Sequence, residues 1–380
     1  MTNPLSFSLV AGEASGDLLA SLLLSGMRQR WPNLKSMGIG GPRMQAQGFE
    51  AWWSSEKLAV RGYVEVLRHY REIIGIRQQL KARLLTERPN AFIGVDAPDF
   101  NLDLSRDLKA AGVPTVHFVC PSIWAWRANR IEKIRQSVDH VLCIFPFEPA
   151  LLAQHGIDAT YVGHPLAQII PHHLDRDAAR QKLGLQPHVR VVALLPGSRA
   201  SEIDYLCERF LRAAQTMSRQ RPDLHFVLPA MPNLKSRIED LAQAVGGVPN
   251  LNILVGQSHD ALAACDATLI ASGTATLEAA LFKRPMVIAY NMHWLSWQIM
   301  RRKKLQPWVG LPNILCGEFV VPELLQDQAT PHNLTHEVLR WLDAPARVQA
   351  LQQRFDDLHH ELRRDTATLA TDAIEKVLTR

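Results

Sequence analysis

The stretch Val191-Val192-Ala193-Leu194-Leu195-Pro196-Gly197-Ser198-Arg199 joins an apolar run to a glycine-containing turn, and a helical pattern follows it. A continuous apolar run of this kind is typical of a strand that is covered on both faces. Where such a strand leads through a turn into a helix, backbone N–H groups and the positive end of the helix dipole stabilise a phosphate. The stretch therefore predicts an α/β fold with a phosphate-binding turn at Gly197, Ser198 and Arg199.

A second junction of the same kind follows the apolar run 267–271 and reads Ser272-Gly273-Thr274-Ala275-Thr276-Leu277-Glu278. Two such junctions in one half of a chain indicate a nucleotide diphosphate site formed by Ser272, Gly273 and Thr274 together with the first turn. Arg199 can bind a diphosphate through two hydrogen bonds, and Glu278 can accept hydrogen bonds from a ribose. Glu278 is equally explained as a favourable charge near a helix start. A third segment, Leu311-Pro312-Asn313-Ile314-Leu315, supplies the amide of Asn313 to the same cleft.

Short apolar runs alternate with longer helical patterns along most of the chain, at 5–11, 91–95, 115–119, 140–145, 191–195, 225–228, 252–255, 267–271 and 286–289. The repeated order of strand and helix predicts two doubly wound parallel-sheet (Rossmann-like) domains whose loops surround a shared cleft. The pattern pauses at Gly163-His164-Pro165 and restarts after Pro171-His172-His173. We therefore expect domains at 1–168 and 169–330, and helices at 331–380 that pack across the domains or onto a second subunit, as in a homodimer.

The composition describes an ordinary globular protein, with 380 residues, 47% hydrophobic and 21% charged. A formal charge of +5 favours anionic partners without indicating nucleic acid. The five cysteines are scattered and include no C-x-x-C pair, so they predict buried thiols and neither a disulfide framework nor a cysteine zinc site. No signal peptide pattern and no spanning run of about 18 to 20 apolar residues occurs. We expect a cytoplasmic protein whose membrane contact, if any, is peripheral.

The segment Gly12-Glu13-Ala14-Ser15-Gly16-Asp17 follows the first predicted strand and precedes a helical stretch at 18–30. Its glycines permit a tight turn and close approach of a ligand, and Ser15 is expected to cap the helix. A turn and cap without a ligand is the competing interpretation. The dinucleotide fingerprint is matched neither here nor at Gly38-Ile39-Gly40-Gly41, which argues against a nicotinamide or flavin cofactor.

Asp96 directly follows the predicted strand 91–95, in the segment Asp96-Ala97-Pro98-Asp99-Phe100-Asn101. A carboxylate at that edge of a sheet can accept a proton from an attacking hydroxyl, provided that its surroundings tune it. A turn or cap role is as consistent with the pattern, and Asp99 is expected to cap the next helix. No further ligand in register supports a metal at this Asp-x-x-Asp spacing, so we expect none.

The loop Pro121-Ser122-Ile123-Trp124-Ala125-Trp126-Arg127 follows the predicted strand 115–119. Ser122, Trp124 and Arg127 are candidates to stack on a sugar or to hold a phosphate, and packing between loop and helix is the alternative.

The segment 58–85 combines a basic face with a wide apolar one. A helix of this composition suits an anionic membrane surface, although a core-facing amphipathic helix is the commoner explanation. The predicted membrane contacts are Val64, Val66, Leu67, Tyr70, Ile73 and Ile74.

Six of these segments, taken in series over about residues 5–325, resemble the lipid-A-disaccharide synthase family. They are the segments 12–17, 96–101, 121–127, 195–199, 272–278 and 311–315. The resemblance implies a GT-B glycosyltransferase that joins UDP-2,3-diacylglucosamine to 2,3-diacylglucosamine 1-phosphate, with release of UDP and formation of a β(1→6) bond. It implies an inverting reaction without a metal or other cofactor, at the cytoplasmic face of the inner membrane and its phospholipid surface. Asp96 is then the general base for the acceptor 6-hydroxyl. Arg199, Glu278 and Asn313 match nucleotide-side positions, and residues 12–17 line the acceptor side of the cleft.

Two other classes of function remain open at this point. A UDP-N-acetylglucosamine 2-epimerase shares the two-domain architecture and a similar nucleotide half, but would not need the basic apolar segment. A peripheral membrane module that binds UDP without turnover would need polar strand ends in only one half of the chain.

Overall fold

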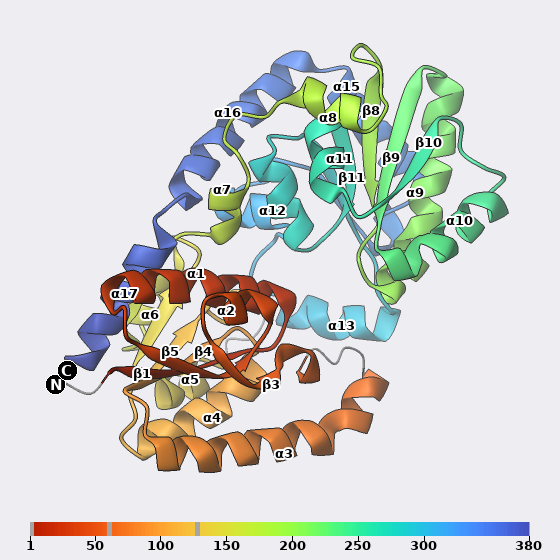
Figure 1. The fold of residues 1–380 in the computed structure, drawn as a ribbon. Coiled ribbons are helices and arrows are strands. Elements are labelled where there is room, and N and C mark those ends of the chain that lie inside the picture. Colours follow the sequence, from red (N-terminus) through yellow and green to blue (C-terminus); the bar gives the residue numbers. More distant parts are fainter. Residues whose placement is uncertain (1–3, 59–62, 126–129, 380) are drawn as a thin grey trace. The chain divides into compact units, whose positions relative to one another are not determined.

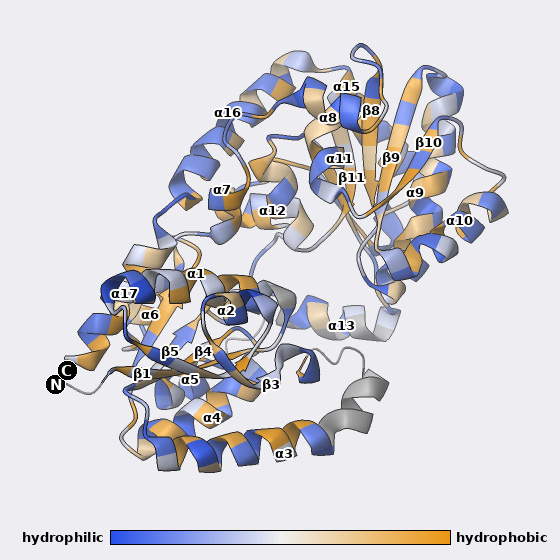
Figure 2. Ribbon diagram, in the orientation of Figure 1, coloured by the Kyte–Doolittle hydropathy of each residue, from blue (hydrophilic) through white to orange (hydrophobic). Residues whose placement is uncertain are grey.

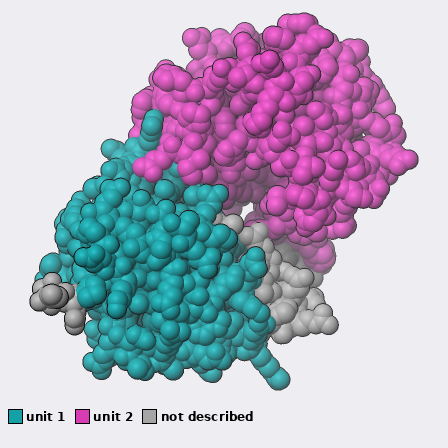
Figure 3. Space-filling model, in the orientation of Figure 1, with its two compact units in different colours: residues 1–165, 361–380 teal, residues 166–360 magenta. Residues whose placement is uncertain are grey.

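The computed structural model describes residues 4–58, 63–125 and 130–379. Its elements form two compact units, one made of Met1–Pro165 with Glu361–Arg380 and the other of Leu166–His360 (Figures 1 and 3). Each unit contains one parallel sheet with helices on both faces. The prediction of two parallel-sheet α/β domains is therefore confirmed.

Unit 1 is built on a seven-stranded sheet in the order β3-β2-β1-β4-β5-β6-β7. Its strands are β1 (Ser6–Ala11), β2 (Lys35–Gly40), β3 (Glu50–Ser54), β4 (Ala91–Val95), β5 (Thr115–Phe118), β6 (His140–Cys143) and β7 (Ala159–Tyr161). Its helices are α1 (Ala14–Arg30), α2 (Pro42–Ala46), α3 (Tyr63–Glu87), α4 (Pro98–Ala110), α5 (Ile131–Ser137), α6 (Glu148–Ala153) and α17 (Thr366–Leu378).

The core of unit 1 lies between this sheet and helices α3 and α4. Ile76, Leu80 and Leu84 recur every four residues on α3 and pack against Val10 and Phe92 of the sheet. All five residues are at most 7% exposed, so the α3 stripe that carries the first three is a core face. Figure 2 shows apolar and polar residues alternating along α3, with apolar strands of the sheet above it in this view.

Unit 2 is built on a six-stranded sheet in the order β10-β9-β8-β11-β12-β13. Its strands are β8 (Arg190–Leu195), β9 (Leu224–Ala230), β10 (Leu251–Val255), β11 (Ala267–Ala271), β12 (Met286–Tyr290) and β13 (Glu323–Leu325). Its helices are α7 (Pro165–Ile169), α8 (Arg176–Lys182), α9 (Ala200–Gln220), α10 (Lys235–Ala244), α11 (Ser258–Ala264), α12 (Thr274–Leu281), α13 (Trp294–Lys303), α14 (Leu311–Cys316), α15 (Pro331–Leu342) and α16 (Pro345–Leu362).

Each sheet reverses its strand order once, and this reversal positions the candidate site. In unit 1 the reversal lies between β1 and β4, and in unit 2 between β8 and β11. At such a switch point the loops at the carboxyl ends diverge to opposite faces of the sheet, which leaves a crevice for a ligand. The four loops involved are those that carry Gly12, Asp96, Gly197 and Gly273.

The apolar runs of the sequence did not predict four of the strands, β2, β3, β7 and β13. Strands β7 and β13 have three residues each, too few to show a period, and β3 carries two tryptophans among polar residues. The segment of β2 contains Gly38 and Gly40, which resemble a loop. Gly38 is required in the strand because a Cβ atom there would lie 2.2 Å from the carbonyl oxygen of Leu9 on β1, and its φ is +137°.

The C-terminal helices are divided between the units. Helix α17 packs on α1 in unit 1, whereas α15 packs on α9, β11 and β12 in unit 2. Arg30 at the end of α1 forms an ion pair with Asp372 of α17 at 2.5 Å and a second one with Glu375. In the described part of the chain, no helix combines the length and apolar character needed to cross a membrane.

Candidate functional site

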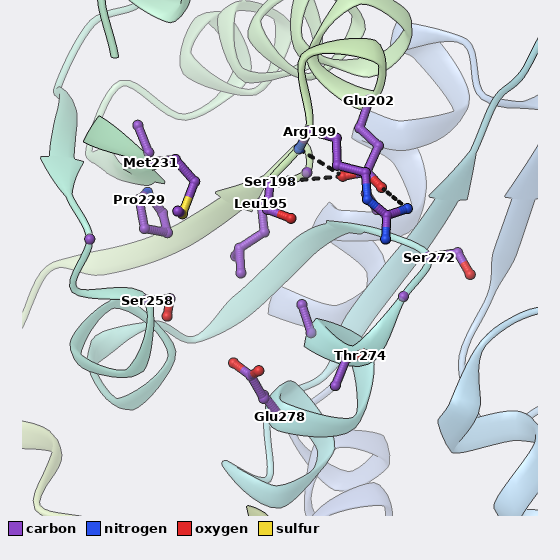
Figure 4. A pocket seen from close by; sticks show the side chains of 16 residues that line it. Leu195, Ser198, Arg199, Glu202, Pro229, Met231, Ser258, Ser272, Thr274 and Glu278 are labelled. Atoms are coloured by element: carbon purple, nitrogen blue, oxygen red, sulfur yellow. Dashed lines mark hydrogen bonds and ion pairs between the residues drawn. The ribbon is translucent and has the colours of Figure 1, made fainter. Parts of the chain in front are cut away.

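A pocket of about 370 Å³ opens at the switch point of unit 2, between the loops that follow β8 and β11 (Figure 4). Every residue predicted on the nucleotide side except Asn313 lines it, namely Gly197, Ser198, Arg199, Ser272, Gly273, Thr274 and Glu278. The loops after β9 and β10 contribute further residues to its wall, among them Met231 and Ser258. The tertiary structure thus joins two motifs that are more than 70 residues apart in the sequence.

The loop after β8 is held in shape by Glu202. The Glu202 carboxylate accepts hydrogen bonds from the backbone N–H groups of Ser198 at 2.8 Å and Arg199 at 3.2 Å. It also lies 3.4 Å from the Arg199 guanidinium (Figure 4). Gly197 has a φ of +132°, and a Cβ atom there would lie 2.4 Å from Glu202 Cβ. This turn therefore requires glycine at position 197, and its backbone N–H groups at Ser198 and Arg199 are hydrogen-bonded to Glu202.

The loop after β11 differs from the loop after β8, because among the described residues no side chain takes the place that Glu202 has in the loop after β8. Helix α12 begins at Thr274, so the N–H groups of Thr274 and Ala275 have no partner within the helix, whereas that of Thr276 donates to the Gly273 carbonyl at 3.1 Å. No atom lies within 4 Å of a Cβ built on Gly273, which leaves space beside these donors. Ser272 Oγ donates to the carbonyl of Val309 at 3.0 Å, and in Figure 4 it points away from the pocket. An anion in this pocket would meet backbone donors first.

Glu278 projects into the pocket from the second turn of α12 (Figure 4). Its carboxylate lies 3.4 Å from Nε2 of His259, the second residue of α11. The hydrogen bond with Glu278 raises the pKa of His259 above its ordinary value. Ser258, which precedes this histidine, lines the same pocket, so α11 and α12 present a hydroxyl and a carboxylate suited to sugar hydroxyls.

Asn313 does not line the pocket, because its side chain is used within the protein. The residue is fully buried, and its amide nitrogen donates to the Val321 carbonyl and to Glu323 Oε1, both at 2.9 Å. Its Oδ1 accepts from the N–H groups of Val320 and Val321. Asn313 therefore joins the start of α14 to β13 and holds the loop between them.

At the switch point of unit 1, Asp96 directly follows the last residue of β4 and has an unusual backbone conformation. Asp96 and Ala97 both have left-handed φ angles, +50° and +43°. Asn101 holds this turn, since its buried side-chain nitrogen donates to the Asp96 carbonyl at 2.8 Å. Non-glycine residues persist in such conformations only when their surroundings impose them, and they cluster at functional sites. Burial, together with the nearby Glu13 carboxylate, raises the pKa of Asp96 above its ordinary value.

The loop at residues 12–17 lies beside this turn. A Cβ on Gly12 would be 3.3 Å from Ala97 Cβ, and one on Gly16 would be 3.7 Å from the Val95 carbonyl. Helix α1 begins at Ala14 with Glu13 in the capping position and no side-chain cap, so the expectation that Ser15 caps it is wrong. The likewise expected capping role of Asp99 is wrong, because Ala97 precedes α4 in that position.

Asp17 is turned inward. It is 3% exposed, and its carboxylate accepts from the backbone N–H groups of Gly41, Arg43 and Met44 at 3.0 to 3.1 Å. These donors form the start of α2, which has no side-chain cap of its own. Asp17 therefore fixes the loop between β2 and α2, and Glu13 and the exposed Ser15 remain at the surface of the turn.

The loop after β5 rests on a buried acid. Trp124 is 9% exposed, and its ring packs edge-on against Phe145 and Phe147. Its indole N–H donates to Glu148 Oε1 at 3.0 Å. Burial raises the pKa of Glu148 to about 7. Trp124 thus supports the loop from beneath. Ser122 is exposed, and Arg127 lies outside the described residues.

Two basic residues of helix α3 form ion pairs within unit 1. Arg77 pairs with Asp103 at 2.9 Å and Lys81 with Asp107 at 2.7 Å, both partners lying on α4. Of the predicted membrane contacts, Ile73 packs against the core and Ile74 is half-buried. The side chains of Val64, Val66, Leu67 and Tyr70 lie outside the described residues.

The chain is similar to known proteins over nearly its whole length. A model of the lipid-A-disaccharide synthetase family matches residues 7–377. The chain is 65% identical over 379 residues to the lipid-A-disaccharide synthase of Albidiferax ferrireducens, covering 98% of this chain and 97% of that protein. It is 62% identical over 383 residues to that of Verminephrobacter eiseniae, covering 100% and 98%.

Solved structures resemble the chain in fold. UDP-GlcNAc 2-epimerase from Neisseria meningitidis, bound to UDP-GlcNAc, matches with a TM-score of 0.65 at 12% identity, over 98% of this chain and 99% of that one. A glycosyltransferase from Rickettsia africae matches with 0.61 at 10% identity, over 100% and 99%. The shared architecture is the GT-B fold. Because an epimerase and a transferase both have it, the fold alone does not distinguish these activities.

Proposed function

Because the chain belongs to the lipid-A-disaccharide synthase family, we propose that it condenses UDP-2,3-diacylglucosamine with 2,3-diacylglucosamine 1-phosphate. It is a glycosyltransferase that forms the lipid A disaccharide, and its substrates are a nucleotide sugar and a lipid-linked sugar. The products would be the β(1→6) disaccharide 1-phosphate and UDP. The observation that carries the proposal is the single pocket formed by two phosphate-type junctions in a chain of this family.

UDP would bind in the pocket of unit 2. Its diphosphate would face the first turn of α12, where backbone N–H groups and the helix dipole favour negative charge. Arg199 would add a bidentate contact, since its side chain is 61% exposed beside the pocket. Glu278 would accept hydrogen bonds from the ribose. Because these donors stabilise the diphosphate as it leaves, we propose that no metal takes part.

Asp96 would act as the general base. As the acceptor 6-hydroxyl attacks C1 of the donor sugar, its proton passes to Asp96 and the bond from C1 to the UDP oxygen breaks. Attack from the face opposite UDP inverts the configuration at C1. The raised pKa of Asp96 supports this role, because a carboxylate with a higher proton affinity is a stronger base. The imposed left-handed turn supports it independently.

We also propose that the protein works at the cytoplasmic face of the inner membrane, where its acylated substrates reside. The first half of α3 would supply the contact through Val64, Val66 and Leu67, because Ile76, Leu80 and Leu84 in the second half face the core. A second contact would come from α13 and the residues after it. Trp294 and Leu305 are 64% and 56% exposed there, and the exposed Arg301 and Arg302 add positive charge.

The transfer reaction is tested by incubating purified protein with both diacylated substrates, with and without EDTA, and detecting the disaccharide by mass. We expect equal product in both samples. Product that disappears with EDTA while the melting temperature stays unchanged would overturn metal independence of the transfer, and no product in either sample would overturn the substrate assignment. A parallel incubation with UDP-N-acetylglucosamine alone detects an epimerase, whose product would appear there instead.

The membrane contact is tested by changing Val64, Val66 and Leu67 together to Ser. We expect the variant to bind anionic vesicles more weakly than the wild type in a flotation assay, with an unchanged circular dichroism spectrum. A variant with Ser at the exposed Val255 of unit 2 serves as the control. Unchanged flotation of the triple variant would contradict the proposed surface.

A further inference from the structure

We propose that unit 2 carries a binding site for a divalent transition metal ion such as zinc, with His172, Asp356 and His360 as ligands. His172 lies in the connection between α7 and α8, while Asp356 and His360 lie on α16. Their three ligand atoms all lie within 4.8 Å of one another, and among the described residues this is the group whose spacing fits an ion. No residue of this trio lines the nucleotide pocket.

The spacing of the donor atoms is close to that of a metal site. His172 Nε2 is 3.2 Å from Asp356 Oδ1, and His360 Nε2 is 3.7 Å from Asp356 Oδ2. Ligands about 2.0 to 2.2 Å from a tetrahedral zinc ion are separated from one another by about 3.3 Å. Asp356 and His360 are four residues apart on α16 and so share one face of the helix. Small side-chain rotations would bring all three donors onto one ion.

The Nε2 atom of His172 adds an independent observation. It is a buried atom that forms no hydrogen bond of acceptable geometry within the described chain. Asp356 Oδ1 is near enough, yet its direction from the ring does not suit a hydrogen bond. A buried ring nitrogen that faces a carboxylate without such a bond is the arrangement expected when an ion belongs between the two.

The donor types select the class of ion. Two imidazoles and one carboxylate suit zinc, cobalt, nickel or ferrous iron, whereas magnesium and calcium prefer all-oxygen sites. Three protein ligands leave at least one position for water. Lys283 is the competing cation, since its Nζ is 3.9 Å from Asp356 Oδ1. Its shorter contacts are with His359 Nδ1 at 2.6 Å and the His172 carbonyl at 3.2 Å, so it mainly holds the main chain of the site.

The place of the site in the chain indicates its purpose. The chain passes between the units twice, after Pro165 and after His360. His172 follows the first passage closely, and His360 is the last residue before the second. A bound ion would tie these two connections together within unit 2. The expected consequence is a more stable unit 2, because an ion that binds only the folded state stabilises it.

The test uses protein freed of metal by chelation and then titrated with zinc chloride by calorimetry. We expect one equivalent to bind the wild type and the melting temperature to rise. His172→Ala and His360→Ala should each weaken binding about tenfold or more. His188→Ala is the matched control, an exposed histidine of unit 2 that is not one of the three proposed ligands, and should bind as the wild type does.

Cobalt chloride provides a second readout, because three-ligand binding gives visible absorption bands that a loosely held surface ion lacks. Bands in the wild type and the His188 variant, lost in both trio variants, would support the site. Absence of binding, or binding weakened equally by His188→Ala, would overturn it. His360 is exposed, so its replacement leaves folding intact and keeps the test decisive even if His172→Ala unfolds the unit. Neither readout depends on transfer activity.

Discussion

The turns at the switch points of the two units are built from different types of residue. In unit 2 the turns after β8 and β11 contain Gly197 and Gly273, and residues at the start of α12 line the pocket beside the second turn. In unit 1 the turn after β4 contains Asp96 and Ala97 in left-handed conformations, with Asn101 holding it. In the proposed reaction a diphosphate would need close access to main-chain donors, which glycine allows. The proposed proton acceptor would need a side chain, which agrees with a non-glycine residue in the strained turn.

The supporting residues differ in the same way. Buried polar side chains hold the loops of unit 1, with Asp17 bonded to the start of α2 and Glu148 to Trp124. In unit 2 the pocket loops are held by Glu202, at the surface of its own helix, and by main-chain hydrogen bonds. Buried groups cost more when removed than exposed ones. Substitutions in unit 1 should therefore have larger effects than those in unit 2.

The largest effect is expected from Asp96→Asn. Asparagine adopts the left-handed conformation as readily as aspartate, so the turn should survive. The loss of the base should lower kcat about 10²- to 10⁴-fold, measured by mass detection of the disaccharide. Circular dichroism and the melting temperature should match those of the wild type. A folded variant with near-normal transfer would remove Asp96 from the role of base.

Asp17→Ala should lower the free energy of unfolding by about 4 kcal/mol, because three backbone donors at the start of α2 lose a buried charged acceptor. Urea denaturation measures the change. Asp17→Asn should lie between this variant and the wild type, since it keeps the oxygen that two of the donors use. If all three proteins had the same midpoint, Asp17 would not hold the loop as the contacts indicate.

Glu148→Gln tests the buried acid under Trp124 through pH. The pKa of Glu148 is raised by burial from 4.5 to about 7 in the folded protein, so the folded state binds more protons than the unfolded state between these values. The contribution of Glu148 to the free energy of unfolding is therefore fully present below about pH 4.5, and it is lost as the pH rises to about 7. At 1.36 kcal/mol per pKa unit, the fall is about 3 kcal/mol.

Glutamine does not titrate, so the variant should lack this part of the pH dependence while keeping the oxygen that accepts from Trp124. Denaturation midpoints at pH 5 and pH 8 give the comparison. Parallel curves for the two proteins across that range would show that Glu148 is ionised in the folded state.

Arg199→Ala should have the smallest effect of the four. The side chain is largely exposed, so stability should change by less than about 0.5 kcal/mol. The KM for the donor should rise about tenfold, because one charge-assisted contact is lost while the backbone donors of α12 remain. Steady-state kinetics with varied donor measures this, with Arg212→Ala on the outer face of α9 as the control. An unchanged KM would place the diphosphate elsewhere.

The sequence predicted much of the fold and the two turns that line the pocket of unit 2, because those features are local. Apolar runs such as 91–95 and 267–271 became buried strands with the predicted bounds, since burial on both faces demands continuous apolar residues. The turns at Gly197 and Gly273 were found because only glycine suits their conformation or clearance. Met231 and Ser258 were missed, because nothing in their own segments signals that β9 and β10 end beside the same pocket.

The tertiary structure decided how the polar side chains are used. A pattern shows that Asp17, Trp124 and Asn313 follow strands or begin helices, but not which distant groups they meet. Asp17 meets the start of α2, Trp124 meets Glu148, and Asn313 meets Glu323, so none of the three offers its full side chain to a ligand. His172 acquires its partners only when α16 packs beside it. Local sequence determines strand, turn and helix, whereas hydrogen bonds and ion pairs between segments depend on which elements the fold makes neighbours.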